Sequence, residues 1–200
     1  VHKSVRDTFL AALKKEFHSL LGENPQESRH YVRIVNDRAF ERLKGYLGCG
    51  DIVFGGHTDE SERYFEPTVL DNVSPDSPVM QEEIFGPIFP VLTFSDIDEA
   101  TDFIVSRPKP LALYYFGSKG KQVLRRTSSG GACINDTIMH IANENLPFGG
   151  VGNSGMSSYH GKGSFDAFTH HRAVVKTPTF LDLPFRYMPY RLFDLTKKLL

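Results

Sequence analysis

The sequence predicts an α/β fold in which crossover helices connect the strands of a parallel sheet. Between residues 88 and 135, apolar segments suited to strands alternate with segments of helical periodicity, in the order strand, helix, strand, helix, strand. This alternation is typical of parallel sheets with crossover helices. In addition, 40% of the 200 residues are hydrophobic, which is enough to bury a core.

The first predicted element is an amphipathic helix that Gly22 and Pro25 bring to an end. Ser4 and Asp7 resemble the cap of this helix, so we expect the chain to start inside a fold, with further chain upstream of Val1. The apolar stripe of the helix consists of Val5, Phe9, Ala12, Leu13, Phe17, Leu20 and Leu21.

A second helix is predicted to begin at Asn36, whose side chain can cap it, and to end at Gly48. Short strands are predicted at 51–54 and 67–70, where apolar residues are bounded by glycine or proline. After them, the apolar segment 88–94 leads into another helix.

Ser95, with Asp98 three residues later, predicts a capping box for the helix that follows. The unbroken apolar run 111–116 predicts a strand covered on both faces. A helix at 119–128 and a short strand at 132–135 complete the alternation.

The C-terminal part is predicted to contain a helix at 163–168, a strand at 171–176 and a tail from residue 178. Pro184 and Pro189 interrupt regular structure in the tail. Its last residues place three leucines on one helical stripe, which we expect to pack on the same or a partner subunit; they are Leu192, Leu195 and Leu199. This segment is too short for stable membrane binding by itself.

Charge and cysteine content exclude several classes of protein. The net charge of −1 is spread over both signs, so no nucleic-acid partner is expected. Cys49 and Cys133 form no C-x-x-C pair, which argues against a disulfide framework or a zinc site, and each is interpreted as a structural thiol. With no apolar run long enough to cross a bilayer and no leader pattern, we expect a cytoplasmic protein.

Neither the late histidines nor the late glycines predict a ligand site. The histidines lack metal-ligand spacing; they are His140, His160, His170 and His171. Residues 150–155 match G-x-G-x-x-G, but a loop precedes them and no acidic residue follows at the required distance. We therefore reject a dinucleotide fingerprint there and expect glycines that permit close backbone approach.

The segment 81–87 combines two carboxylates with an aromatic ring and a Gly-Pro turn. Glu82 or Glu83 could accept hydrogen bonds from a ribose diol while Phe85 lies against a flat heterocycle. An exposed glutamate pair beside a core phenylalanine is the alternative. The residues alone leave both interpretations open.

A series of motifs in one order resembles aldehyde dehydrogenases of the class 3 branch. The resemblance extends from Val1 to about Lys176. It rests on PVMQEEIFGP at 78–87, KPLALYYF at 109–116, SSGG at 128–131, ND at 135–136, LPFGGVGNSGM at 146–156 and SYHG at 158–161. The resemblance implies a catalytic domain over 1–169, incomplete at its N-terminus, an oligomerisation strand over 170–177 and a C-terminal tail over 178–200.

The resemblance also implies functions for three side chains. Glu83 matches the glutamate that holds the nicotinamide ribose of NAD or NADP, and Phe85 matches the ring that contacts the nicotinamide. Phe148 would line the aldehyde pocket. The strand at 171–176 would take part in a homodimer.

The chemistry that the resemblance implies is oxidation of an aldehyde to a carboxylic acid through a cysteine thioester. Neither Cys49 nor Cys133 stands in the Gly-Gln-x-Cys type motif of the nucleophile. We expect the nucleophile and the general-base glutamate upstream of Val1, and therefore no turnover by this chain alone. Complementation by an upstream half would restore activity.

Two alternatives remain at the level of sequence. The chain could be a non-catalytic interaction subunit that pairs with intact family members through the strand at 171–176. It could also belong to a reductase of acyl phosphates or acyl-CoA on the same fold, although 146–156 resembles the class 3 branch more closely.

Overall fold

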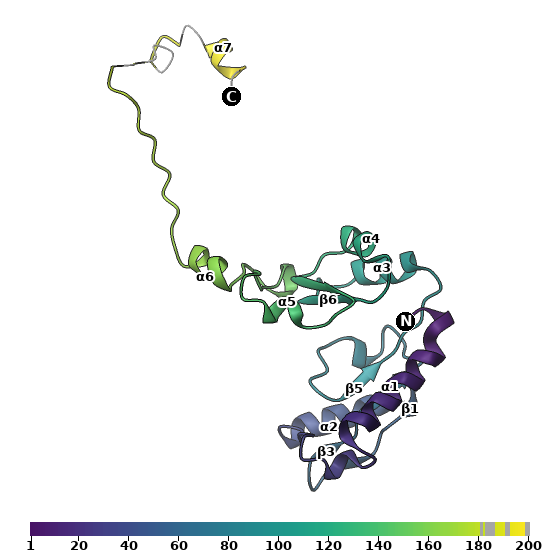
Figure 1. Ribbon diagram of the computed structural model, residues 1–200. Coiled ribbons are helices and arrows are strands. Elements are labelled where there is room, and N and C mark those ends of the chain that lie inside the picture. Colours follow the sequence, from purple (N-terminus) through teal and green to yellow (C-terminus); the bar gives the residue numbers. More distant parts are fainter. Residues whose placement is uncertain (181, 183–186, 191–192, 199–200) are drawn as a thin grey trace.

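A computed structural model describes residues 1–180, 182, 187–190 and 193–198 (Figure 1). The α-helices are α1 (Arg6–Leu21), α2 (Asp37–Tyr46), α3 (Ile97–Val105), α4 (Gly120–Arg126), α5 (Met139–Ala142), α6 (Gly161–Ala167) and α7 (Phe193–Lys197). The strands are β1 (Asp51–Phe54), β2 (Thr58–Asp59), β3 (Tyr64–Phe65), β4 (Thr68–Asp71), β5 (Ile88–Pro90), β6 (Ala112–Tyr115) and β7 (Gly131–Ile134). Short 3-10 helices are η1 (Lys3–Val5), η2 (Pro25–Glu27), η3 (Leu47–Cys49), η4 (Pro78–Met80) and η5 (Gly152–Ser154).

The strands form three small sheets. In the first, β4 lies between β1, which is antiparallel to it, and β5, which is parallel. Strands β2 and β3 form a short hairpin, and β6 pairs in parallel with β7 through the crossover helix α4. The predicted α/β class with parallel pairing is confirmed, while the antiparallel β1 is an addition to it.

Helix α1 lies across the β1-β4-β5 sheet (Figure 1). Leu10, 6% exposed, packs with Val69 and Val91, and the ring of Phe17 meets that of Phe54 edge-on with centroids 5.5 Å apart. The predicted stripe is covered only in part, because Leu20 at the end of the helix is 73% exposed.

Helix α2 supplies the main core. The Asn36 side chain accepts a hydrogen bond from the Ala39 amide at 2.8 Å and caps the helix, as predicted. The buried side chains of the helix pack against residues from β3, β4, η4 and β5; this cluster contains Phe40, Leu43, Tyr46, Phe65, Leu70, Val73, Val79 and Ile88.

The cap predicted for α3 is wrong by one residue. Asp96 is the N-cap, and its carboxylate accepts a hydrogen bond from the Asp98 amide at 2.8 Å. The Ser95 amide instead donates to Glu99 Oε2 at 2.9 Å. Serine and aspartate both suit an N-cap. The Ser95 carbonyl accepts a hydrogen bond from the His2 ring, and Asp96, one residue later, is the N-cap.

Strand β6 is not covered on both faces by the part of the chain that the structure describes. Its residues are half-buried, and Tyr114 is 38% exposed. An apolar run predicts a strand that can be buried, but burial also requires neighbouring elements, and β7 is the strand that pairs with it here.

The strand predicted at 171–176 is not formed in this chain. These residues are exposed and have no strand partner among the described residues, and Figure 1 shows the segment leading away from α6. A strand exists only when its backbone pairs with another strand, so sequence propensity alone does not create it.

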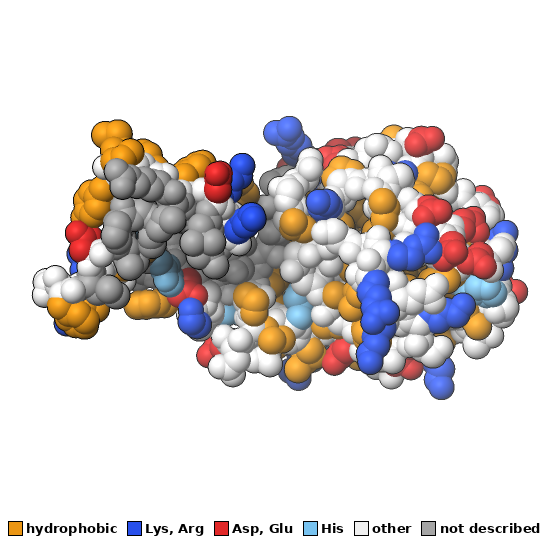
Figure 2. All heavy atoms as spheres, turned by 90° about the horizontal axis from the view of Figure 1, so that it is seen from above, with side chains coloured by type: hydrophobic (Ala, Val, Ile, Leu, Met, Phe, Trp, Pro, Cys, Tyr) orange, Lys and Arg blue, Asp and Glu red, His pale blue; other side chains and the backbone are white. Residues whose placement is uncertain are grey.

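The predicted leucine stripe of the tail lies mostly outside the described residues, since Leu192, Leu199 and the side chain of Leu195 are not among them. Helix α7 covers five residues of the tail. Within the described ranges, no helix is long and apolar enough to cross a membrane. Acidic and basic side chains are interspersed over the body of the molecule, as Figure 2 shows for one face.

Candidate functional site

The loop 81–87 connects η4 to β5 and lies against α2. Gly86 brings the loop close to the helix, because a Cβ atom there would come within 2.5 Å of the Leu43 side chain. A side chain at this position would displace the loop or the Leu43 side chain, which is fully buried. Glycine therefore suits the point where this loop meets the core.

Glu83 and Phe85 project from this loop into solvent. The Glu83 carboxylate has no hydrogen bond or ion pair with any described residue and is free to accept. Phe85 is 74% exposed and has a φ of 46°, in the left-handed region that a bulky residue rarely adopts. A strained, exposed aromatic residue is an outlier of the kind that clusters at ligand sites.

Glu82, the neighbouring carboxylate, is held to the protein. The Tyr46 hydroxyl and Arg42 of α2 both donate to Glu82 Oε1, the latter at 3.5 Å. The hydrogen bond from Tyr46 and the nearby Arg42 guanidinium lower the pKa of Glu82, while burial of the Tyr46 ring raises the pKa of its phenol. Of the two glutamates, Glu83 is the one available to a ligand.

Phe148 lies in a separate group of aromatic side chains. Its backbone exchanges hydrogen bonds of 2.9 and 2.8 Å with that of Tyr159. The half-buried ring contacts Tyr159 edge-on at 5.5 Å, stacks on His160 at 5.9 Å and lies 5.7 Å from His140. The ring is thus fixed by the 146–160 loop, and no hydrogen bond or aromatic contact of the described residues joins it to Glu83 or Phe85.

The sequence motifs do not indicate two groups that lie near these residues. Arg42 and Tyr46 contact the 82–84 segment. Their spacing of four residues places them on one face of α2, and this spacing is the signal in the sequence that could have indicated a shared contact. His140 Nδ1 lies 3.5 Å from the sulfur of Cys133, and no motif connects those two residues in the sequence.

The glycine motif at 150–155 follows a loop rather than a strand, as predicted. A Cβ on Gly150 would come within 2.0 Å of the Ser154 carbonyl oxygen, so the motif closes on itself. Ser154 Oγ also accepts a hydrogen bond from the Val151 amide at 2.9 Å. These glycines serve backbone packing.

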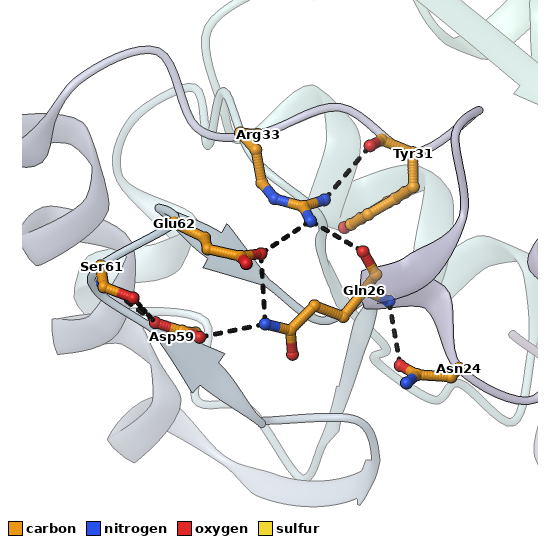
Figure 3. A network of polar contacts seen from close by, with 7 residues as sticks. All are labelled: Asn24, Gln26, Tyr31, Arg33, Asp59, Ser61 and Glu62. Carbon is orange, nitrogen blue, oxygen red and sulfur yellow. Dashed lines mark hydrogen bonds and ion pairs between the residues drawn. The ribbon is translucent and has the colours of Figure 1, made fainter.

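A polar network ties the segment after α1 to the β2-β3 hairpin (Figure 3). Arg33 donates to the Gln26 carbonyl at 2.7 Å and to Glu62 at 2.9 Å, and the Gln26 amide donates to Asp59 at 3.0 Å. Hydrogen bonds from Ser61 and Gln26 lower the pKa of Asp59. These hydrogen bonds connect the segment 24–33 to the β2-β3 hairpin, so the network holds this loop in place.

A hollow of about 880 Å³ lies at the carboxyl ends of β6 and β7. It is lined by Lys119, Lys121, Arg125 and Arg126, and it contains none of Glu83, Phe85 and Phe148. Arg126 is paired with Asp98 and Asp102. No cluster of the described residues has the composition of a metal site.

The aldehyde dehydrogenase family profile matches residues 1–174 of the chain. The chain is 51% identical over 196 residues to 4,4'-diaponeurosporen-aldehyde dehydrogenase of Staphylococcus aureus, covering 96% of this chain and 43% of that protein. It is 50% identical over 190 residues to human aldehyde dehydrogenase family 3 member B1, covering 92% and 41%. The chain thus spans less than half the length of these relatives.

Solved structures show the same fold. A structure described as the substrate-bound state of Staphylococcus aureus AldH superposes with a TM-score of 0.88 at 50% identity, covering 100% of this chain and 45% of that one. An NAD-dependent aldehyde dehydrogenase from Sinorhizobium meliloti superposes with a TM-score of 0.76 at 26% identity, covering 90% and 39%.

Proposed function

Because this chain belongs to the aldehyde dehydrogenase family, with about 50% identity to its family 3 members, we propose that it supplies cofactor and substrate contacts of an enzyme that oxidises aldehydes to carboxylic acids. The cofactor in this proposal is NAD or NADP. When bound, it supplies the two-electron oxidant for the aldehyde.

The observation that carries the proposal is the pair formed by Glu83 and Phe85. A free carboxylate can accept two hydrogen bonds from a ribose diol, and an exposed phenyl ring can lie against a flat heterocycle. Glu83 has no partner among the described residues, and Phe85 is 74% exposed on the same loop. The acceptor and the exposed ring therefore fit a nicotinamide nucleotide.

Phe148 is proposed to line the aldehyde pocket. Its ring is fixed from three sides by His140, Tyr159 and His160, so it presents a rigid apolar wall. Such a wall excludes water from the aldehyde carbon and favours apolar substrates.

The nucleophile and the general-base glutamate are proposed to come from an upstream half. Cys49 ends η3 beside the main core, and Cys133 lies in the middle of β7; both are half-buried. Neither stands in the Gly-Gln-x-Cys type motif of the family's nucleophile. We propose that the chain alone does not turn over, because thiol attack creates the species that is oxidised.

Reconstitution tests this proposal. The chain would be mixed with a separately produced upstream half of a 50% identical relative, and NAD(P)H formation would be followed at 340 nm with aliphatic and aromatic aldehydes. We expect turnover from the mixture and none from either part. If both halves fold and associate without turnover, the proposal is wrong, and the alternative of a non-catalytic interaction subunit would then explain the association.

A further inference from the structure

Two side chains of α2 hold the loop that carries Glu83 and Phe85. Arg42 donates to the Ile84 carbonyl at 2.6 Å and to the Glu83 carbonyl at 3.5 Å, while the Tyr46 hydroxyl donates to the Glu82 carboxylate. Arg42 also donates to the Tyr46 hydroxyl oxygen at 3.0 Å. We call Arg42 and Tyr46 the α2 clasp.

The α2 clasp belongs to a helix whose buried face is packed in the main core. Tyr46 is 4% exposed, and Phe40 and Leu43 of the same helix are buried in the main core. The guanidinium of Arg42 lies 5.4 Å from the centre of the Tyr46 ring, which limits its freedom. A helix packed in this way transmits its position to the loop more accurately than a neighbouring loop would.

The contacts of the α2 clasp do not involve the Glu83 carboxylate. The clasp engages the carbonyls of Glu83 and Ile84 and the carboxylate of Glu82, so the Glu83 carboxylate remains available. Phe85 follows immediately in its left-handed conformation, with φ of 46°. Such a conformation persists only where the surrounding contacts over-determine it, and the clasp provides contacts on the residues before Phe85.

We propose that Arg42 and Tyr46 are positioning residues that hold the 82–84 segment so that Glu83 and Phe85 are presented to NAD or NADP. This inference rests on the proposed function, since it takes the loop as the cofactor contact. Arg42 and Tyr46 act through the loop and need not touch the cofactor.

The first test measures the order of the loop without any cofactor. Backbone ¹⁵N relaxation at residues 83–85 would be compared in the wild-type chain, in Arg42→Ala and in Tyr46→Phe, which keeps the buried ring. Arg38→Ala is the matched control, because Arg38 is an exposed arginine of the same helix and has no partner among the described residues. We expect lower order parameters at 83–85 in the two clasp variants and unchanged values in the control. Equal order in all four proteins would overturn the inference.

The second test uses the reconstituted enzyme and titrates NADH by its fluorescence. Loss of hydrogen bonds made by a charged group predicts about tenfold weaker binding for Arg42→Ala. Arg42→Lys should not restore the affinity, because an ammonium group cannot bridge the sites that the planar guanidinium spans. The KM for the aldehyde should remain as in the control.

The two tests fail in different ways. Wild-type affinity in Arg42→Ala, or full rescue by lysine, would overturn the clasp while the proposed function stands. Absence of NADH binding by the wild-type enzyme would overturn the proposed function, and the relaxation measurement would then decide whether the clasp orders the loop.

Discussion

At the scale of single residues, two adjacent glutamates have different environments. Glu82 accepts hydrogen bonds from Tyr46 and Arg42, whereas the Glu83 carboxylate has no partner among the described residues. The first contributes to the structure of the loop and the second is free to bind. Substitution can therefore separate stability from ligand affinity.

Glu83→Gln is expected to weaken NADH binding by the reconstituted enzyme about tenfold, because a charged acceptor is lost. Its free energy of unfolding should stay within about 0.5 kcal/mol of wild type, since the side chain makes no contact that folding requires. Calorimetric titration and urea denaturation measure the two quantities. Glu16→Gln, an exposed carboxylate of α1, is the control, and equal affinities in both variants would contradict the prediction.

Glu82 gives the loop a dependence on pH. Its pKa is lowered below the ordinary value of 4.5, first by the hydrogen bond from Tyr46, so the unfolded chain binds the proton more readily than the folded chain. The stabilisation is complete above pH 4.5 and is lost as the pH falls through the folded-state pKa. Urea denaturation below pH 4.5 should therefore show a shallower loss of stability for Glu82→Gln and Tyr46→Phe than for wild type. Parallel curves for the three proteins would contradict this.

The sequence indicated Glu83, Phe85 and Phe148 because short motifs contain them. It did not indicate Arg42, whose hydrogen bond to the Ile84 carbonyl joins residues far apart in the chain. Nor did it predict that Glu82 and Glu83 differ, because that difference arises from Tyr46. Local patterns can name a loop, but the contacts that hold it depend on the fold.

At the scale of elements, helices were predicted best. The periodicity of α1 and α2 and the Asn36 cap are local properties of the chain, and the structure has both. Burial of β6 and strand pairing of residues 171–176 both depend on partners outside those segments. The residue types within the segments therefore could not predict either outcome.

The cap of α3 offers a direct comparison of sequence and structure. Asp96→Ala should lower the free energy of unfolding by about 1 kcal/mol, because it removes the acceptor for the Asp98 amide. Ser95→Ala should change it by less than about 0.5 kcal/mol, since the Ser95 hydroxyl makes no hydrogen bond among the described residues. Thermal and urea denaturation of the two variants check this order, and the reverse order would restore the cap predicted from the sequence.

At the scale of the whole molecule, one ion pair joins α1 to the central strand β4. Arg6 donates to the Asp71 carboxylate, whose side chain is only 3% exposed. Removing Arg6 leaves the buried Asp71 carboxylate uncompensated, so Arg6→Met should lower the free energy of unfolding by about 3 kcal/mol. Asp7→Asn, which alters the 89% exposed partner of the same arginine, should cost less than about 1 kcal/mol. Similar losses in the two variants would contradict this account.

The segment 171–176 is expected to pair with a second copy of the chain. Val175 is 87% exposed and Val174 is 73% exposed, so neither is required for folding within one protomer. Val175→Lys should shift the chain towards monomer in sedimentation velocity without changing its far-UV circular dichroism. Thr179→Lys, exposed beyond the segment, is the control. A monomeric wild-type chain, or a variant of unchanged mass, would refute this assembly.

At Phe85, the residue that best fits the left-handed backbone differs from the residue that is proposed to contact the cofactor. Glycine adopts that conformation without steric strain, so a search for thermostable variants would favour Phe85→Gly. The same change would delete the ring that is proposed to contact the cofactor. Selection for thermal stability alone would therefore raise the free energy of unfolding and lower the affinity for the cofactor. At this position stability and activity oppose each other through one side chain.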